Sequence, residues 1–332
     1  MALNHLGVRG VEMKSREHQR LDILATISGV MIAIQARVNG ELSSQLGNGV
    51  QAALVSFGSG LIVIALIAIF SPTIKEGARN LRGAVTRGEL PRWTLFAGAL
   101  GGTFVAIQTH VVPVIGVAIY SVASIAGQTA ASLLVDRLGI TGGGKKQITF
   151  RRTAAALFTV FAVFISVLDR IEAADLALFA VFLAGVAGAV VGVQRALNGQ
   201  INEHSHQSFT TSLLNFFMGT SFLTLLLFAL LIFGDSDISP LPAGPWWIYT
   251  GGVIGVIYIA FTSTIVQHLG VLTFTLFSVG GQLVGSLLID LYSPTDGVHV
   301  SVYLVSGIAM TYLGVIVGGV NNSQSRKRLT HK

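Results

Sequence analysis

The chain has 332 residues, is 52% hydrophobic and only 11% charged, and carries a net charge of +6. Soluble domains contain about 25% charged residues, so this composition indicates an integral membrane protein. The sequence has no cysteine, which excludes disulfides, thiolate metal sites and cysteine nucleophiles. No basic stripe with interleaved aromatic residues occurs, so we expect no nucleic-acid partner.

Apolar runs of about 20 residues recur along the whole length and predict an all-α polytopic protein in contact with the lipid bilayer. The first run follows a polar, basic segment, residues 1–20, and is interpreted as an uncleaved span. Short gaps at 113–116 and 267–270 predict tight hairpins. The ten predicted transmembrane spans are residues 21–38, 50–70, 94–112, 117–136, 152–169, 176–195, 210–233, 246–266, 271–291 and 300–320.

The distribution of Lys and Arg predicts the orientation of these spans. With the N-terminus in the cytoplasm, 19 of the 21 Lys and Arg residues fall in cytoplasmic segments, and only Arg37 and Arg170 fall outside. Cytoplasmic loops of membrane proteins are enriched in these residues. We therefore expect both termini in the cytoplasm, including a basic tail at 321–332.

One polar motif occurs twice, 154 residues apart. The first copy, Gly-Gln-Thr-Ala-Ala-Ser-Leu-Leu-Val-Asp, spans residues 127–136, and the second, Gly-Gln-Leu-Val-Gly-Ser-Leu-Leu-Ile-Asp, spans 281–290. A serine precedes each glutamine by four residues, so Ser, Gln, Ser and Asp recur at steps of four along one helix face. A polar stripe inside a membrane helix is costly unless it faces other helices or water.

The two halves match in other places as well. Gln-x-x-x-Asn-Gly occurs at 35–40 and at 194–199, Ser56-Phe57 matches Asn215-Phe216, and we align Gly98 and Gly102 with Gly251 and Gly255. Each half, 21–170 and 176–320, then holds five spans. Because five is odd, the second half must enter the membrane from the opposite side. The sequence predicts two inverted five-helix repeats, an architecture typical of alternating-access transporters.

These paired motifs resemble the YdcZ-like family of bacterial inner-membrane proteins, within the drug/metabolite transporter superfamily. Many members are single five-span halves, whereas this chain looks like two halves fused. The resemblance implies ten helices around a central cavity, an inner-membrane location and export of a small molecule.

The two glutamines of the motif, Gln128 and Gln282, lie near the middle of their spans. A buried amide without partners costs several kcal/mol in hydrocarbon. Both amides therefore either line a cavity and bind substrate or bridge helices as interhelical hydrogen bonds. The flanking serines either line the same cavity or bond to their own helix backbone; they are Ser124, Ser132, Ser278 and Ser286.

The motif carboxylates, Asp136 and Asp290, lie toward opposite sides of the membrane in this topology. Each is interpreted as a proton-coupling or gating group, or else as a boundary carboxylate at the interface. Arg137 follows Asp136 directly, which favours a local ion pair there.

The Gln-x-x-x-Asn pairs, Gln35 with Asn39 and Gln194 with Asn198, each share one helix face. Each pair either lines an access path or serves helix capping and packing, with the following Gly at the helix end. Arg37 and Arg195 lie in the same segments. Either could attract an anionic substrate, and snorkelling of the side chain to the interface is the simpler interpretation.

No pattern in the sequence predicts a metal site, a cofactor or catalytic residues. Gly139 to Lys145 matches the start of a phosphate-binding loop, but Lys146 replaces the required Ser or Thr, so active transport would be secondary. We expect a secondary transporter, more an exporter than an importer, and not an enzyme. The alternatives are a flippase for a lipid-linked carrier and a non-transporting membrane partner. The amide-rich stripe favours polar, uncharged or zwitterionic substrates, and the oligomeric state is left open.

Overall fold

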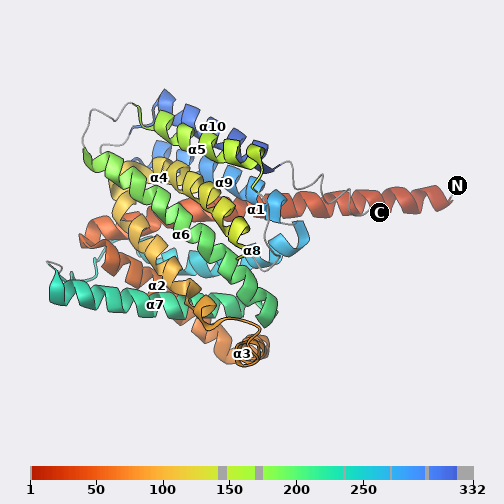
Figure 1. Ribbon diagram of the computed structural model, residues 1–332, viewed down its shortest axis with the longest axis horizontal. Coiled ribbons are helices and arrows are strands. Elements are labelled where there is room, and N and C mark those ends of the chain that lie inside the picture. The colour runs from red at the N-terminus through yellow and green to blue at the C-terminus, as the bar shows by residue number, and fades with distance from the viewer. Residues whose placement is uncertain are drawn as a thin grey trace.

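The computed structural model describes residues 2–140, 148–168, 175–234, 237–269, 271–295 and 299–319, and these residues form helices without a β-strand (Figure 1). The predicted all-α class is confirmed. The elements in chain order are α1 (Ala2–Leu46), α2 (Gly49–Phe70), α3 (Pro72–Thr86), η1 (Arg92–Phe96), α4 (Ala97–Leu138), α5 (Phe150–Ser166), α6 (Asp175–Ser205), α7 (Ser208–Phe233), η3 (Trp246–Tyr249), α8 (Gly251–Leu269), α9 (Val271–Tyr292) and α10 (Val302–Gly319).

Helix α4 contains two of the predicted spans, joined at Gly116. This glycine has φ 80° and ψ 170°, a backbone conformation that residues with a Cβ avoid, and Pro113 precedes it. The rings of Phe104 and Tyr120 are nevertheless 6.2 Å apart, although 16 residues of straight helix would separate them by about 24 Å. The chain therefore folds back at Gly116, where a hairpin was expected. We refer to residues 97–115 as α4a and residues 117–138 as α4b.

Helices α1 and α6 both continue beyond the ends predicted for their spans. Helix α1 ends at Leu46, where Gly47 has φ 65° and its N–H donates to the carbonyl of Ser43 at 2.9 Å. Helix α6 ends at Ser205. The C-cap interpretation of Asn39 and Asn198 is therefore wrong, because both lie about two turns inside their helices.

Helix α3 was not predicted, because its residues were assigned to a basic loop. Ser71 caps its first turn, with its Oγ 3.4 Å from the amide nitrogen of Ile74, and Pro72 occupies the first helical position. Its apolar side is buried, and its basic side chains are exposed. It is seen almost end-on at the bottom of Figure 1, across the direction of α7. An amphipathic helix of this kind suits a membrane surface.

Two close helix crossings are related by the sequence repeat. Gly29 of α1 lies against the backbone of Ser278 in α9, and Gly188 of α6 lies against the backbone of Ser124 in α4b. Gly188 is the repeat equivalent of Gly29, and Ser278 is that of Ser124. Each half therefore supplies its first helix to a crossing with the fourth span of the other half. Small residues permit this close approach in membrane proteins.

A third contact joins equivalent residues directly. Phe57 of α2 and Phe216 of α7 have ring centroids 5.2 Å apart. A Cβ at Gly60 would meet Phe216, and a Cβ at the equivalent Gly219 would meet Phe57. The α2–α7 contact is therefore symmetrical with respect to the repeat.

The contacts also correct the alignment of the third spans. Gly98 faces the carbonyl of Asn215, and Gly252 faces the carbonyl of the equivalent Ser56. Gly98 thus corresponds to Gly252, and the predicted pairing with Gly251 is wrong by one residue. Short Gly-rich helices without charged residues fix the register weakly, so the sequence alone misses such a shift.

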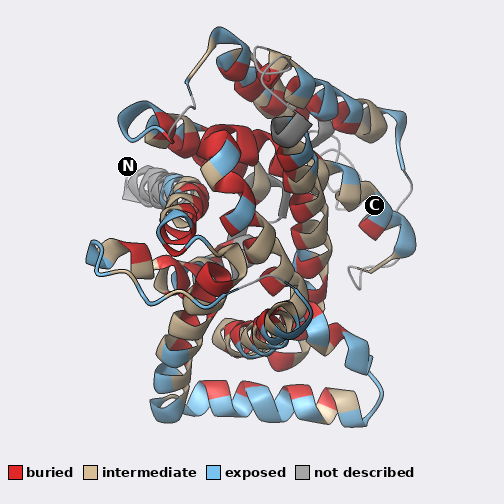
Figure 2. Cartoon of the chain, turned by 90° about the vertical axis from the view of Figure 1, so that its left-hand side faces the viewer, coloured by how far each residue is buried: buried red, intermediate tan, exposed pale blue. Residues whose placement is uncertain are grey.

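Exposed residues lie along the outer surface of the helix bundle (Figure 2), and many of them have large apolar side chains. Phe70, Phe150 and Phe233 are among the most exposed, which a soluble protein would avoid on this scale. By length and composition, six helices of the described residues could cross a membrane, including the stretch that contains the Gly116 break, and two shorter helices are also apolar. The chain is therefore a multi-pass membrane protein.

The crossing at Gly29 gives a first testable prediction. Gly29→Ala places a methyl group on the backbone of Ser278, and overpacking of this kind costs about 1–3 kcal/mol. We expect a lower thermal unfolding temperature of the purified protein in detergent. Gly58→Ala is the matched control, because nothing lies within 4 Å of a Cβ at Gly58. Equal unfolding temperatures for the two variants would contradict the close crossing.

Candidate functional site

The polar stripe of α4b becomes more accessible along the helix. Ser124 is fully buried, whereas Gln128 and Ser132 are partly exposed. Ser132 donates to the carbonyl of Thr129 at 2.7 Å, so it bonds within its own helix. Gln128 instead donates to the hydroxyl of Ser124 at 3.2 Å. Its amide is therefore the member of this stripe that connects to other side chains.

Gln128 also accepts a hydrogen bond from Arg195 of α6. The distance from Arg195 Nη1 to Gln128 Oε1 is 2.6 Å, and Arg195 Nη2 donates to the hydroxyl of Tyr258 in α8 at 3.1 Å. The Arg195 side chain is exposed, and Tyr258 is partly buried. Three helices thus meet at a cation held by an amide and a phenol. No motif or spacing in the sequence singles out Tyr258.

At its other end, the stripe of α4b leads into a buried polar cluster. Asn39 donates to the side-chain oxygen of Gln108 at 3.1 Å, and both residues are fully buried. The hydroxyl of Tyr120 lies next to Gln108 and Ser124. We call the following set the polar chain: Asn39, Gln108, Tyr120, Ser124, Gln128 and Arg195. It crosses the apolar core from α1 to α6.

Three atoms of the polar chain are buried without a hydrogen-bond partner, Asn39 Oδ1, Gln108 Nε2 and the Tyr120 hydroxyl oxygen. Buried polar atoms in proteins are almost always paired, often with water or a ligand. These atoms belong to α1, α4a and α4b. This cluster is therefore a place where a water molecule or a polar group of a substrate would be stabilised.

The remaining Gln and Asn candidates form contacts between helices. Gln35 donates to the carbonyl of Gly251 at 2.9 Å. Gln194 donates to the side-chain oxygen of Asn215 at 2.9 Å, and Asn215 donates to that of Asn198 at 2.7 Å. Asn215 was noticed only as part of the repeat and not as a site residue. Asn215 lies in α7, between two amides of α6, so the spacing of residues along α6 could not predict its position.

The stripe of α9 is closed in this structure. Ser278 is 5% exposed, Gln282 3% and Ser286 0%. Ser286 donates to the carbonyl of Leu283 at 3.0 Å. Among the described residues no hydrogen bond joins Gln128 to Gln282. The two copies of the motif are thus in different environments, one partly open and one buried.

Asp290 binds the first turn of α4b. Its two carboxylate oxygens accept hydrogen bonds from the backbone N–H groups of Val117, at 3.2 Å, and Ala118, at 2.8 Å, and its side chain is 2% exposed. Because the chain breaks at Gly116, these N–H groups have no partner within the helix, and a carboxylate at a helix N-terminus stabilises them. The side chain of Asp136 lies outside the described residues.

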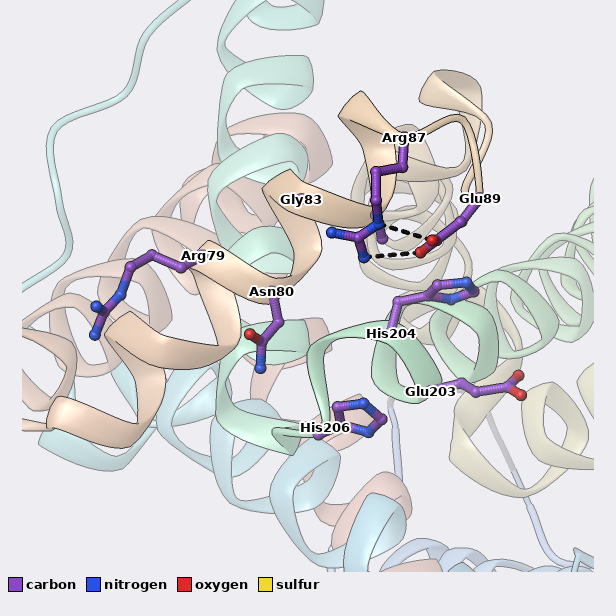
Figure 3. Close-up of a pocket in the computed structure, with 9 residues that line it drawn as sticks. Arg79, Asn80, Gly83, Arg87, Glu89, Glu203, His204 and His206 are labelled. Carbon is purple, nitrogen blue, oxygen red and sulfur yellow. Dashed lines mark hydrogen bonds and ion pairs between the residues drawn. The ribbon is translucent and has the colours of Figure 1, made fainter.

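Two cavities of the described residues lie away from the polar stripes. One, of about 420 Å³, is formed by α3 and the end of α6 and is lined by Arg79, Arg87, Glu89, His204 and other residues (Figure 3). There Arg87 donates to Glu89 at 2.7 and 2.9 Å, and this hydrogen bond lowers the pKa of the Glu89 carboxyl. No group of three His, Asp or Glu residues suited to a metal occurs in the part of the chain that the structure describes.

The second cavity has a volume of about 730 Å³ and lies between α4a and α7. His110 and Asp237 contribute its titratable groups, and its other walls are largely apolar. Neither cavity contains Gln128 or Gln282.

The long apolar helices and the exposed apolar surface define a helical membrane protein. The sequence profile of a family described as "Putative inner membrane exporter, YdcZ" matches residues 21–165 and, a second time, residues 179–317. The chain belongs to this family, which confirms the resemblance seen in the paired motifs. It is therefore a multi-pass inner-membrane protein made of two copies of the family unit.

The other comparisons add the fold alone. A crystal structure matches over 92% of this chain and 96% of its own chain, with 13% sequence identity and a TM-score of 0.52. No curated protein matches the sequence.

The Asp290 cap gives a second prediction. Asp290→Ala leaves two buried N–H groups without their acceptor, at about 1–3 kcal/mol each. We expect a clear loss of thermal stability and faster amide hydrogen exchange at Val117 and Ala118. Asp290→Asn, which keeps one acceptor oxygen, should lose less. Asp237→Ala, at an exposed aspartate, is the control, and an equal effect of both alanine variants would contradict the cap.

Proposed function

We propose that this protein is a secondary transporter that exports a small metabolite or drug by alternating access. The polar chain is the observation that carries this proposal. Hydrocarbon makes buried polar groups costly, so they persist in membrane proteins mainly where they bind substrate or another helix. Here they form a series from the buried Asn39 to the exposed Arg195, with unpaired atoms in the middle of the core.

The proposed architecture is ten spans in two inverted halves, with both termini in the cytoplasm. Three contacts support it. Exchange of the halves converts the Gly29–Ser278 contact into the Gly188–Ser124 contact, and it leaves the Phe57–Phe216 contact unchanged. Halves of five spans, one inserted opposite to the other, give two conformations related by that exchange.

The different environments of the two stripes indicate which conformation is present. In the proposed topology, the buried end of the α9 stripe at Ser286 and Asp290 points outward, and the partly exposed end of the α4b stripe at Ser132 points to the cytoplasm. In this topology the bundle is closed on the outer side, where Asp290 joins the two halves, and open on the cytoplasmic side.

The repeat predicts an equivalent contact on the cytoplasmic side. The offset that relates Asp290 to Asp136 also relates Val117 and Ala118 to Val271 and Leu272. Asp136 would therefore cap α9 when the outer side opens. Gating by the two carboxylates is part of this proposal. Protonation of either carboxylate would weaken its hydrogen bonds to the backbone N–H groups of the other half.

The test compares compounds that cells release. Cells overproduce the wild-type chain, Gln128→Ala, Gln282→Ala or the control Gln45→Ala at matched membrane levels, and the medium is profiled by mass spectrometry. We expect a compound enriched at least severalfold by the wild type and the control and much less by either motif variant. Gln45 is a suitable control because it bonds to Glu41 near the end of α1, outside the polar chain.

Enrichment by all four proteins alike would move the binding site away from the glutamines. If no compound changes, export is wrong, and the flippase and the partner protein become the functions to test.

A further inference from the structure

Arg37 and Arg195 both lie inside helices of the bundle and have different surroundings. Arg37 lies 3.3 Å from the Glu41 carboxylate and donates to Ser293 at 3.1 Å. Arg195 bonds only to uncharged groups, the amide of Gln128 and the phenol of Tyr258. Within the described part of the chain, no carboxylate lies within the 4.0 Å of a salt bridge to Arg195. Its positive charge is therefore not balanced by a described neighbour.

Arg195 is also far from the end of its helix. Helix α6 continues for ten residues to Ser205, which corresponds to about 15 Å. The span predicted to end at residue 195 therefore belongs to a helix that continues beyond it. The guanidinium points to the glutamine of the α4b stripe.

We propose that Arg195, Gln128 and Tyr258 bind the carboxylate of an anionic substrate. This inference rests on the proposed function and names its substrate class. A guanidinium has five N–H donors, of which two are used here. Two of the remaining N–H groups lie in one plane and can bind a carboxylate in a bidentate manner. The Tyr258 hydroxyl accepts from Arg195, so its own proton is free to be donated to the same group.

The charge balance favours a monocarboxylate. A phosphate monoester carries almost two negative charges near pH 7, and one guanidinium would balance only half of them. A zwitterion would need a carboxylate in the protein for its ammonium group, and no described carboxylate contacts this site. The expectation of an uncharged or zwitterionic substrate, drawn from the amides alone, is thus replaced by an organic anion.

The site also fits the direction in which the structure is open. Arg195 is exposed and Gln128 partly exposed, whereas the polar chain beyond Ser124 is buried. A carboxylate arriving from the cytoplasm would meet the cation first. Its uncharged remainder would then lie along Ser124 toward the unpaired amides of Gln108 and Asn39.

The experiment uses pairs of probes that differ only in charge. Thermal unfolding of the purified full-length protein is followed with increasing benzoate or benzamide, and with lactate or lactamide, at constant ionic strength. The proteins are the wild type, Arg195→Gln, Arg195→Lys and Arg37→Gln. The last is a matched control, because it removes an arginine that already has a carboxylate partner.

We expect at least one carboxylate, and neither amide, to raise the unfolding temperature of the wild type and of Arg37→Gln. Arg195→Gln should weaken the apparent affinity at least tenfold, and Arg195→Lys should weaken it less. No stabilisation by either carboxylate, or equal stabilisation of Arg195→Gln, would overturn the proposal. The proposal would also be overturned if Arg195→Gln changed the unfolding temperature only in nanodiscs with anionic lipid. Arg195 would then contact a lipid headgroup and not a substrate.

The outcome is independent of the export test. Carboxylate binding without any released compound would refute the proposed function and keep the site. Release of a compound without carboxylate binding would overturn the carboxylate site and keep the proposed function.

Discussion

The hydrogen bonds between Asp290 and the first turn of α4b impose the main constraint on this structure. The break at Gly116 frees backbone N–H groups in the core of a membrane protein, where unpaired groups are costly. Their acceptor comes from the other half of the chain, 172 and 173 residues away. The first turn of α4b in one half is therefore held by a carboxylate of the other, and the two halves cannot separate there without losing this cap.

The close crossings of α1 with α9 and of α6 with α4b divide the centre of the bundle into two pairs. Backbone contacts at Gly29 and Gly188 leave no room within each pair, whereas polar side chains link one pair to the other. Packed backbones resist deformation, and side-chain hydrogen bonds can be exchanged. In the proposed mechanism, motion between the pairs is therefore the change that needs the least repacking, and it would separate Asp290 from the first turn of α4b.

Much of this fold followed from the sequence. Hydropathy and repeated motifs predicted the helices, the turn at Gly116 and the family, because the apolar period and the glycine requirement are local properties. Helix α3 was missed because its basic surface resembled a loop. The ends of α1 and α6 were missed because both helices continue as amphipathic turns beyond the apolar run. The third-span register was wrong by one residue, which only contacts with Ser56 and Asn215 revealed.

The site was predictable in part. The repeat pointed to Gln128, and the structure joins it to Ser124 as the spacing of four implies. Gln108, Tyr120 and Tyr258 had no sequence signal, because none belongs to the repeated motifs and each gains meaning only from neighbours on other helices. Arg195 illustrates the same limit. Its charge was visible in the sequence, but its uncharged partners and its distance from the helix end were not.

The most direct test of the central claim is a pair of distances measured by double electron–electron resonance. Spin labels at Ile23 and Leu138 report the inner ends of the two helix pairs, and labels at the repeat-equivalent Phe182 and Tyr292 report the outer ends. All four side chains are exposed, and the chain has no native cysteine.

The account predicts two populations for each labelled pair. The outer pair should favour its shorter distance, and conditions that lengthen the outer distance, such as Asp290→Asn, should shorten the inner one. A single fixed distance for both pairs, or a change in the same direction at both ends, would contradict exchange between two inverted halves.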